Sequence, residues 1–266
     1  MVRWEYLIKP REEASELDPE AVHDTYPDRG PDHQQLVAVF SASTGAFEGL
    51  FVGHAIGRWR TGAIGGVAVD RLARPDATTL GVLGSGNQAR TQVRCACAVR
   101  DFEEVHVYSP TREHREAFAA EIGETVAPAV TAVDEPEAAV SGADVLVCAT
   151  TSREPVFDPA WLEPGTHVTS IGPKFEGLQE LPDGAIERAD VIATDSLAQV
   201  DGYDRPFVVG GADRERMIEL SAVVAGETVG RSDPAEITLF CSVGLAGTEV
   251  VLGAALLDEL GREGSG

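Results

Sequence analysis

Lysine is nearly absent from this chain, which has 266 residues and 21 basic side chains. Only Lys9 and Lys174 are lysines, so almost every basic side chain is an arginine. The 44 acidic residues outnumber the basic ones and leave a formal net charge of −23. A field of that sign repels nucleic-acid phosphates and anionic membrane surfaces, so we expect neither as a partner.

The excess of acidic residues has two interpretations. A large net charge keeps a protein soluble in concentrated salt, where the Debye length falls to about 3 Å and self-repulsion is screened. The composition therefore favours a halophilic protein over an acidic protein that is adapted to ordinary salt.

Long apolar runs are also missing from the sequence. No stretch approaches the roughly 18 apolar residues that a membrane helix needs. The first residues, MVRWEYLIKPREEASEL, lack the apolar core of a secretory signal. We therefore expect a cytoplasmic protein.

Cysteine and histidine do not form a metal-binding pattern. The four cysteines, Cys95, Cys97, Cys148 and Cys241, contain no CxxC pair. They are interpreted as small buried residues without disulfides. The histidines His54, His106 and His167 also lack metal-ligand spacing, so no metal site is expected.

Strands and helices alternate along the chain after Pro75, whereas residues 1–34 are charged and interrupted by prolines, as in an irregular segment. Apolar patterns predict strands at 36–40, 47–52, 78–83, 104–108, 125–130, 143–149, 167–171, 191–194 and 237–240. They predict helices at 54–72, 88–99, 112–122, 135–140, 215–224 and 245–260. This alternation is typical of an α/β fold with a Rossmann-type, doubly wound parallel sheet.

The most specific local pattern is Gly84-Ser-Gly86-Asn-Gln-Ala89, between a predicted strand and a predicted helix. It fits the dinucleotide-binding pattern G-x-G-x-x-A. Gly84 makes the tight turn, Gly86 lets the backbone approach a pyrophosphate, and Ala89 lets the helix pack closely on the strand. We predict cofactor contacts from Gly84, Ser85, Gly86, Asn87, Gln88 and Ala89. The alternative is a glycine turn that binds nothing.

The end of the next predicted strand indicates the cofactor. NAD-selective sites place an acidic residue there to accept the ribose 2′-hydroxyl. This chain has Ser109, Thr111 and Arg112 instead, and hydroxyl and guanidinium groups suit a 2′-phosphate. We therefore favour NADP over NAD. In the alternative interpretation, Thr111 caps the following helix and Arg112 is a solvated surface residue.

Further motifs follow one another along the chain. They are Arg58-Trp-Arg60-Thr61-Gly, Ala149-Thr-Thr151-Ser-Arg, Ser170-Ile-Gly172-Pro, Val191-Ile-Ala-Thr-Asp195-Ser and Leu239-Phe-Cys-Ser242-Val-Gly244. Together with the glycine pattern, they resemble the ornithine cyclodeaminase/μ-crystallin family from about Tyr26 to Leu260. The region before Tyr26 is shorter than in that family. Cys241 replaces a basic residue and Glu249 replaces an aspartate.

The resemblance implies a Rossmann domain at 75–244 and a smaller, discontinuous dimerisation and substrate domain at 1–74 and 245–266, in a homodimer. It implies that Arg60 binds the substrate carboxylate and that Asp195 is the catalytic acid or base. It adds as cofactor-binding residues Thr61, Thr150, Thr151, Ser152, Gly172, Ser242 and Gly244. Lys174 and Glu180 flank a loop that either covers the cofactor or is a solvated connection.

The implied substrate is a small amino acid or a cyclic imine. An ornithine cyclodeaminase would transfer a hydride to NAD(P), release ammonia and return the hydride to give proline. A ketimine reductase or an alanine dehydrogenase would instead turn over the cofactor. Because the substrate half is shortened, a non-catalytic NAD(P)-binding protein is the alternative of another class.

Overall fold

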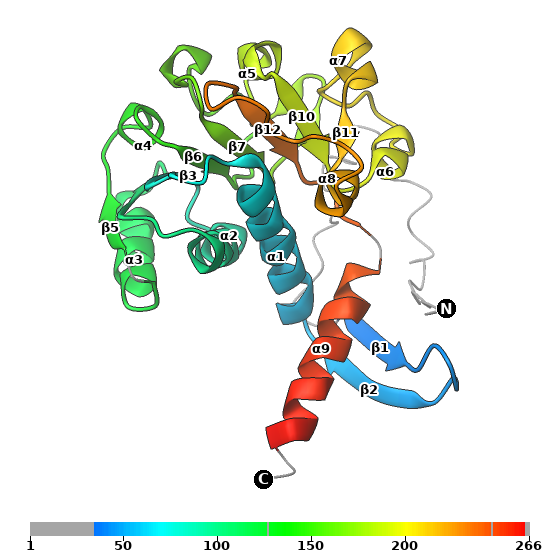
Figure 1. Cartoon of the computed structure of the whole chain (residues 1–266). Helices are drawn as coiled ribbons and strands as arrows, with labels where there is room; N and C mark the ends of the chain where they lie inside the picture. Colours follow the sequence, from blue (N-terminus) through cyan, green and yellow to red (C-terminus); the bar gives the residue numbers. More distant parts are fainter. Residues whose placement is uncertain (1–34, 127, 246, 264–266) are drawn as a thin grey trace, which may run out of the picture. The chain divides into compact units, whose positions relative to one another are not determined.

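A computed structural model of the chain describes residues 35–126, 128–245 and 247–263 (Figure 1). Residues 58–245 form one compact unit, and residues 35–57 with 247–263 form another. The irregular segment expected at 1–34 lies outside the described residues. The boundary between the two units lies between Gly57 and Arg58, within the helix Ala55–Leu72. The boundary expected from the sequence lies at residue 74.

The larger unit is built on a parallel sheet. Its strands are β3 (Thr79–Leu83), β4 (Glu104–Tyr108), β5 (Ala129–Ala132), β6 (Val145–Cys148), β7 (His167–Ser170), β10 (Val191–Thr194), β11 (Ile218–Glu219) and β12 (Thr238–Cys241). Their order is β11-β10-β12-β7-β6-β3-β4-β5, and every neighbouring pair is parallel. The chain runs outward from β3 to β5 and returns on the other side of β3 as β6. This order confirms the predicted α/β fold with a doubly wound parallel sheet. Such sheets bind ligands at the point where the strand order reverses.

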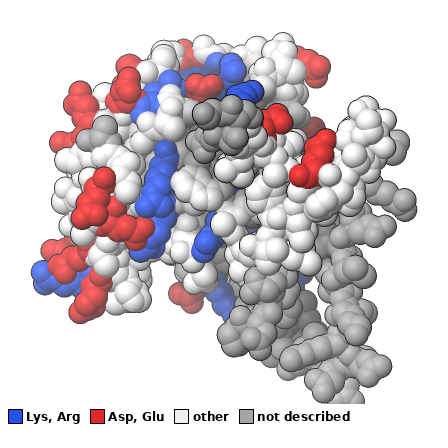
Figure 2. Space-filling model, turned by 90° about the horizontal axis from the view of Figure 1, so that it is seen from below, with Lys and Arg blue, Asp and Glu red and all other residues white. Residues whose placement is uncertain are grey.

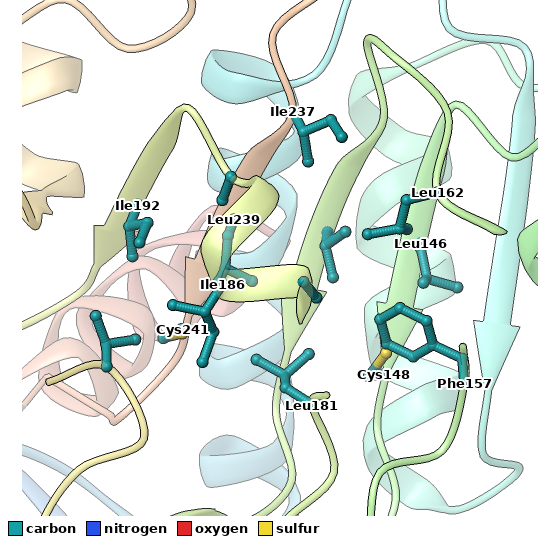
Figure 3. Packing of buried hydrophobic residues seen from close by; sticks show 14 of the residues in the cluster. Leu146, Cys148, Phe157, Leu162, Leu181, Ile186, Ile192, Ile237, Leu239 and Cys241 are labelled. Carbon is teal, nitrogen blue, oxygen red and sulfur yellow. The ribbon is translucent and has the colours of Figure 1, made fainter. Parts of the chain in front are cut away.

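Helices cover both faces of this sheet (Figure 1). They are α1 (Ala55–Leu72), α2 (Asn87–Val99), α3 (Arg112–Gly123), α4 (Glu137–Val140), α5 (Asp183–Arg188), α6 (Leu197–Asp201), α7 (Gly211–Glu215) and α8 (Leu220–Ala225). Val69, Val93 and Phe118 of the first three helices pack with Val82 and Val105 of the sheet. A second core includes residues of α4 and α5, and Figure 3 shows Leu146, Ile186, Ile192 and Leu239 among its members.

Helices α1 and α2 cross at very short range. A Cβ atom on Gly62 would lie 2.8 Å from the Thr91 side chain, and one on Gly65 would lie 1.8 Å from Gln92 Oε1. Only glycine allows this approach. Gln92 is buried between the helices and donates through Nε2 to the carbonyl of Thr61 at 3.0 Å. The sequence Arg60-Thr61-Gly62 is thereby held against the helix that opens with the glycine pattern.

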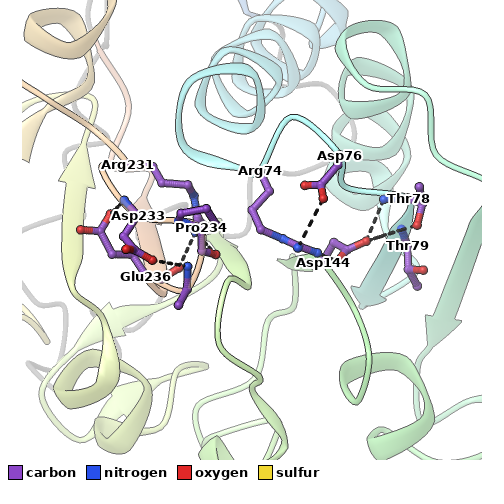
Figure 4. A network of polar contacts seen from close by, with 10 residues as sticks. Arg74, Asp76, Thr78, Thr79, Asp144, Arg231, Asp233, Pro234 and Glu236 are labelled. Atoms are coloured by element: carbon purple, nitrogen blue, oxygen red, sulfur yellow. Dashed lines mark hydrogen bonds and ion pairs between the residues drawn. The ribbon is translucent and has the colours of Figure 1, made fainter.

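A polar network fixes the opposite, amino-terminal edge of the sheet (Figure 4). Asp144 precedes β6 and accepts the backbone amides of Thr78 and Thr79 at 2.7 and 3.0 Å, besides an ion pair with Arg74. Burial raises the pKa of the Asp144 carboxyl, but the amides and Arg74 outweigh it, so that the pKa lies below its ordinary value. The network ties the start of β6 to the start of β3.

Two predicted elements differ from the structure. The helix predicted at 215–224 is wrong, because Ile218 and Glu219 pair with Ala193 and Thr194 as the edge strand β11, between α7 and α8. The strand predicted at 125–130 lies later, at β5, because α3 continues to Gly123 and a turn follows it. The sequence patterns did not predict the short antiparallel pair of β8 (Lys174–Phe175) and β9 (Leu178–Gln179). They also did not predict the 3₁₀ turn Pro159–Trp161.

The smaller unit contains an antiparallel hairpin of β1 (Leu36–Phe40) and β2 (Phe47–Val52) with helix α9 (Thr248–Glu263). Both strands have their predicted bounds. Val37 and Val39 on one face pack with Ile56 and with Val250 of α9. The other face carries five apolar side chains with exposed fractions of 40 to 63%, namely Leu36, Phe40, Phe47, Leu50 and Val52. Within the described ranges, no helix has the length and apolar character to cross a bilayer.

Candidate cofactor and substrate site

The residues predicted to form the site gather along the carboxyl-terminal edge of the parallel sheet. Most of them follow a strand, whereas Arg60 and Thr61 lie within helix α1. The glycine pattern follows β3, Ser109 follows β4, Thr150 to Ser152 follow β6, Gly172 follows β7, Asp195 follows β10, and Ser242 and Gly244 follow β12. Because neighbouring strands are parallel, all these loops leave the sheet on the same side.

The glycine pattern forms a tight turn between β3 and α2. Gly84 has a φ of +108°, and a Cβ atom on it would lie 2.4 Å from the carbonyl oxygen of Ala149 in the next loop. Ala89 is fully buried in the core beneath α2. Gly86 precedes α2 and leaves its first turn without a side-chain cap. The first amides of α2 can therefore donate to a pyrophosphate.

The loop after β4 is tied to the glycine pattern. Ser85 Oγ donates to Ser109 Oγ at 2.9 Å. The buried Arg115 donates to the Ser109 carbonyl at 3.0 Å and pairs with Asp134 at 2.6 Å. Arg115 was not predicted, because a lone arginine on a helix gives no sign of burial. It fixes the position of the loop that follows β4.

Thr111 and Arg112 lie at the surface. Thr111 precedes α3, but its side chain makes no capping hydrogen bond. The side chain of Arg112 is 71% exposed and pairs with Glu116 at 2.7 Å. A guanidinium in that position is accessible to a ligand phosphate, provided that it leaves Glu116.

Glu180 is the central residue that the sequence interpretation left open. It is fully buried. Its Oε2 accepts the amide and the hydroxyl of Thr150 at 2.9 and 2.8 Å. Its Oε1 accepts Ser170 Oγ at 2.8 Å and the amides of Ile171 and Gly172 at 3.1 and 2.6 Å. Glu180 therefore fixes the loops after β6 and β7, and the solvated connection is excluded for this residue.

Lys174 is buried in the same region and donates to the carbonyl of Gly172 at 2.5 Å. Burial lowers the pKa of the Lys174 ammonium, and the carboxylates of Glu180 and Asp195 act in the opposite direction. Burial also raises the pKa of the Cys148 thiol well above its usual range and that of Cys241 to about 12. All four cysteines are free, and these two thiols stay protonated.

Asp195 holds the loop that follows β12. It is buried, and its Oδ1 accepts the amide of Val243 at 2.7 Å. Its Oδ2 accepts the amide of Gly244 at 2.9 Å and the hydroxyl of Ser242 at 3.2 Å. A Cβ atom on Gly244 would lie 3.3 Å from Nη1 of Arg60. The structure thus brings Arg60, Asp195, Ser242 and Gly244 together.

The remaining predicted residues are Thr61 of α1 and two residues of the loop after β6, Thr151 and Ser152. Thr61 is buried, whereas Thr151 is exposed. The amide of Ser152 donates to Thr150 Oγ1 at 3.1 Å, which keeps this loop compact. The edge therefore offers a helix N-terminus, hydrogen-bonded loops and a guanidinium beside the loop that Asp195 holds. These groups can hold a dinucleotide and a small carboxylate ligand.

Comparisons with known proteins show the family of this chain. Residues 20–262 match the model of the family described as ornithine cyclodeaminase/mu-crystallin. The Delta(1)-pyrroline-2-carboxylate reductase of Bacillus cereus is 35% identical over 212 residues, which are 78% of this chain. The matched segment spans only 65% of that relative's own length.

Solved structures also resemble this chain. The Delta(1)-pyrroline-2-carboxylate reductase of Thermococcus litoralis, in complex with NADH and L-proline, is 32% identical with a TM-score of 0.79. That match covers 86% of this chain and 72% of the other. An archaeal alanine dehydrogenase dimer with bound NAD is 30% identical with a TM-score of 0.75, covering 90% of this chain and 75% of the other.

Proposed function

The chain belongs to the ornithine cyclodeaminase/mu-crystallin family, and on this premise we propose that it is an NAD(P)H-dependent enzyme that reduces a small cyclic imino acid. The observation that carries the proposal is the position of Arg60 beside the loop held by Asp195, at the sheet edge that also carries the glycine pattern. The names of the similar Bacillus and Thermococcus reductases support this type of substrate.

Each part of the edge has a separate task in this proposal. The amides that open α2 hold the pyrophosphate, and the loops fixed by Glu180 border the nicotinamide. When bound, the reduced cofactor supplies a hydride to the imine carbon. The guanidinium of Arg60 pairs with the planar carboxylate of the substrate. This pair orients the imine carbon toward the nicotinamide.

Asp195 is proposed to act next to the reacting nitrogen. Its two oxygens already accept hydrogen bonds from the loop of Ser242 to Gly244, so it also positions that loop beside Arg60. Reduction of an imine to an amine takes up a proton as well as a hydride. Delivery of that proton by Asp195 stays a prediction.

We propose NADP as the favoured cofactor, with NAD as the alternative. Ser109, Thr111 and Arg112 provide hydroxyl and guanidinium groups where an NAD-selective site has an acidic residue. The solved relatives named above hold NADH and NAD, which supports the alternative. Titration calorimetry with both cofactors distinguishes them.

Ornithine cyclodeamination is the second candidate reaction, because the family description includes it. It returns the hydride to its own intermediate and therefore leaves the cofactor unchanged. Reduction of Δ1-pyrroline-2-carboxylate instead consumes one NAD(P)H for each turnover. Loss of absorbance at 340 nm with this imine would support the reductase. Formation of proline and ammonia from ornithine without a net change at 340 nm would support the cyclodeaminase.

Binding without catalysis is the candidate of another class, and an alanine dehydrogenase is the remaining enzymatic one. Oxidation of alanine with production of NAD(P)H at 340 nm identifies the dehydrogenase. A folded protein that binds the dinucleotide but turns over none of these substrates is a binding protein, and this outcome overturns the reductase proposal.

We also propose a homodimer that forms through the outer face of the hairpin. Leu36, Phe40, Phe47, Leu50 and Val52 are exposed on that face, and contiguous apolar patches of this kind mark interaction sites. The dimeric archaeal alanine dehydrogenase supports a second copy as the occupant. Light scattering after size exclusion is expected to give twice the chain mass, and Phe47→Glu to give the monomer. A monomeric wild type overturns the proposal.

The net charge of −23 supports a requirement for salt. We therefore expect the melting temperature to rise between low and molar KCl, because salt screens the repulsion among the acidic side chains. A melting temperature that stays constant or falls over this range would remove halophily from the proposal. Activity assays accordingly include molar KCl.

A further inference from the structure

A basic groove of about 520 Å³ runs along α2 in the larger unit. Its lining includes Arg58 and Trp59 of α1, Gly86, Arg90 and Arg94 at or along α2, and Glu121 of α3. Figure 2 shows basic side chains in a stripe on one face of the molecule, with acidic side chains beside it. A positive groove is unexpected in a chain with a net charge of −23, and it points to an anionic ligand.

The charges in this groove are not balanced. Glu121 is the one acidic residue among the lining side chains, and it pairs with two of the three arginines. Arg90 reaches it at 2.7 Å and Arg94 at 3.2 Å. The side chain of Arg58 makes no hydrogen bond or ion pair with any other residue in the described ranges. Its guanidinium is the charge that remains for a ligand.

Arg90 connects the groove to the glycine pattern. It donates to the carbonyl oxygen of Ser85, and its guanidinium lies 5.3 Å from the centroid of the Phe118 ring. With Glu121 as a further partner, Arg90 is fixed on three sides. Arg90 therefore holds the loop of the glycine pattern from α2. Arg58 lines the same groove from α1.

Helix packing places Arg58 level with the first turn of α2. Gly62 of α1 lies close to Thr91 of α2, and Gly66 lies close to Cys95, four residues further along each helix. The two helices therefore run in the same direction. One helical turn earlier in each helix stand Arg58 and Asn87. Asn87 is the first residue of α2, where the unpaired amides are.

We propose that this groove binds the pyrophosphate of the dinucleotide at its end beside the first turn of α2. Arg58 is then a phosphate-binding residue that lies outside the glycine pattern. The inference rests on the proposed function, because it takes a nicotinamide dinucleotide as the ligand. A guanidinium opposite a helix N-terminus gives a pyrophosphate both a mobile and a fixed set of donors. Both cofactors share this group, so Arg58 contributes equally to NAD and NADP.

The test is titration calorimetry of the full chain with NAD⁺, NADP⁺, ADP-ribose and adenosine, at the lowest salt that keeps the protein folded. Arg58→Ala is expected to weaken binding of the three pyrophosphate ligands about tenfold, a typical loss for a charge-assisted hydrogen bond. Binding of adenosine, which lacks phosphate, is expected to stay at the wild-type level. Equal losses of affinity for NAD⁺ and NADP⁺ would show that Arg58 does not bind the 2′-phosphate, which NADP⁺ alone carries.

Two controls remove the same charge elsewhere. Arg71→Ala changes the same helix outside the groove, where Arg71 pairs with its neighbour Asp70, and affinity is expected to be unchanged. Arg94→Ala changes the groove about two turns along α2 from Asn87, and a loss below threefold is expected. If Arg58→Ala matches the wild type, or if all three variants lose affinity equally, the proposal is overturned. A folded wild type that binds no dinucleotide contradicts the proposed function itself.

Discussion

The carboxylate of Glu180 accepts both the amide and the hydroxyl of Thr150, at 2.9 and 2.8 Å, although the two residues stand in different loops of the sheet edge. The other carboxylate oxygen accepts three donors from Ser170, Ile171 and Gly172. One buried side chain therefore sets the distance between the loops after β6 and β7. In the proposed function these loops border the nicotinamide, so their spacing decides how the cofactor ring is held.

Replacement of Glu180 by glutamine tests this role. The amide group of Glu180→Gln places a donor where the loops also present donors, so at least one hydrogen bond is lost in a buried site. We expect the free energy of unfolding to fall by about 2–3 kcal/mol. We also expect weaker binding of the dinucleotide, whereas binding of adenosine is unchanged. Denaturant unfolding and calorimetry measure the two effects.

The matched control is Glu176→Gln in the same connection, since Glu176 is exposed. It is expected to leave both stability and affinity at the wild-type level. Wild-type dinucleotide affinity in a folded Glu180→Gln variant would show that the loop spacing does not matter for the cofactor. The assigned role of Glu180 would then be limited to stability.

The contrast between Gly84 and Glu180 shows what the sequence could predict. The turn at Gly84 follows from a local pattern, a strand, a glycine-rich turn and a helix, and each part is encoded by adjacent residues. Glu180 acts through donors that lie 8 to 30 positions away, and a single acidic residue in a connection gives no signal of them. Strand β11 was missed for the same reason. Ile218 becomes a strand residue only because the edge of β10 is available to it.

Asp195→Asn separates two tasks of one carboxylate. Asparagine keeps one acceptor oxygen but places an amide group opposite Ser242 or the amides of Val243 and Gly244. We expect turnover to fall about 100-fold or more if Asp195 also delivers the proton, with cofactor affinity unchanged. The pH dependence of kcat provides the decisive readout. If only the loop is disturbed, KM rises while the pH profile keeps its shape, and the acid–base role of Asp195 is contradicted.

Arg60→Ala tests the substrate clamp. Loss of a guanidinium that pairs with a carboxylate is expected to raise KM for the imino acid at least about tenfold, because a charge-assisted interaction disappears. Affinity for the dinucleotide is expected to stay within twofold. Arg60→Lys keeps the charge but not the planar pair of donors, so an intermediate KM is expected. Equal KM values in the wild type and Arg60→Ala would rule out Arg60 as the carboxylate-binding residue.

His167 makes stability depend on pH. It is buried on β7, between Thr238 Oγ1 at 2.8 Å and Thr169 Oγ1 at 3.0 Å. Burial, with smaller contributions from Arg231 and Arg100, lowers the pKa of His167 to about 3. In the unfolded chain histidine titrates near pH 6.5. Between these values the unfolded state binds a proton that the folded state does not, so stability falls as the pH decreases.

We expect His167 to contribute a loss that approaches about 1.4 kcal/mol per pH unit below pH 6.5 and levels off near pH 3. Carboxylates such as Asp144 add to acid sensitivity at lower pH, because the pKa of that group is lowered. Denaturant unfolding between pH 4 and 8 isolates the histidine when two variants are compared. His167→Asn is expected to have a shallower slope over this range than His114→Asn, which removes an exposed histidine. Parallel slopes would mean that His167 takes up its proton in the folded protein, and that Thr169 and Thr238 do not keep it neutral.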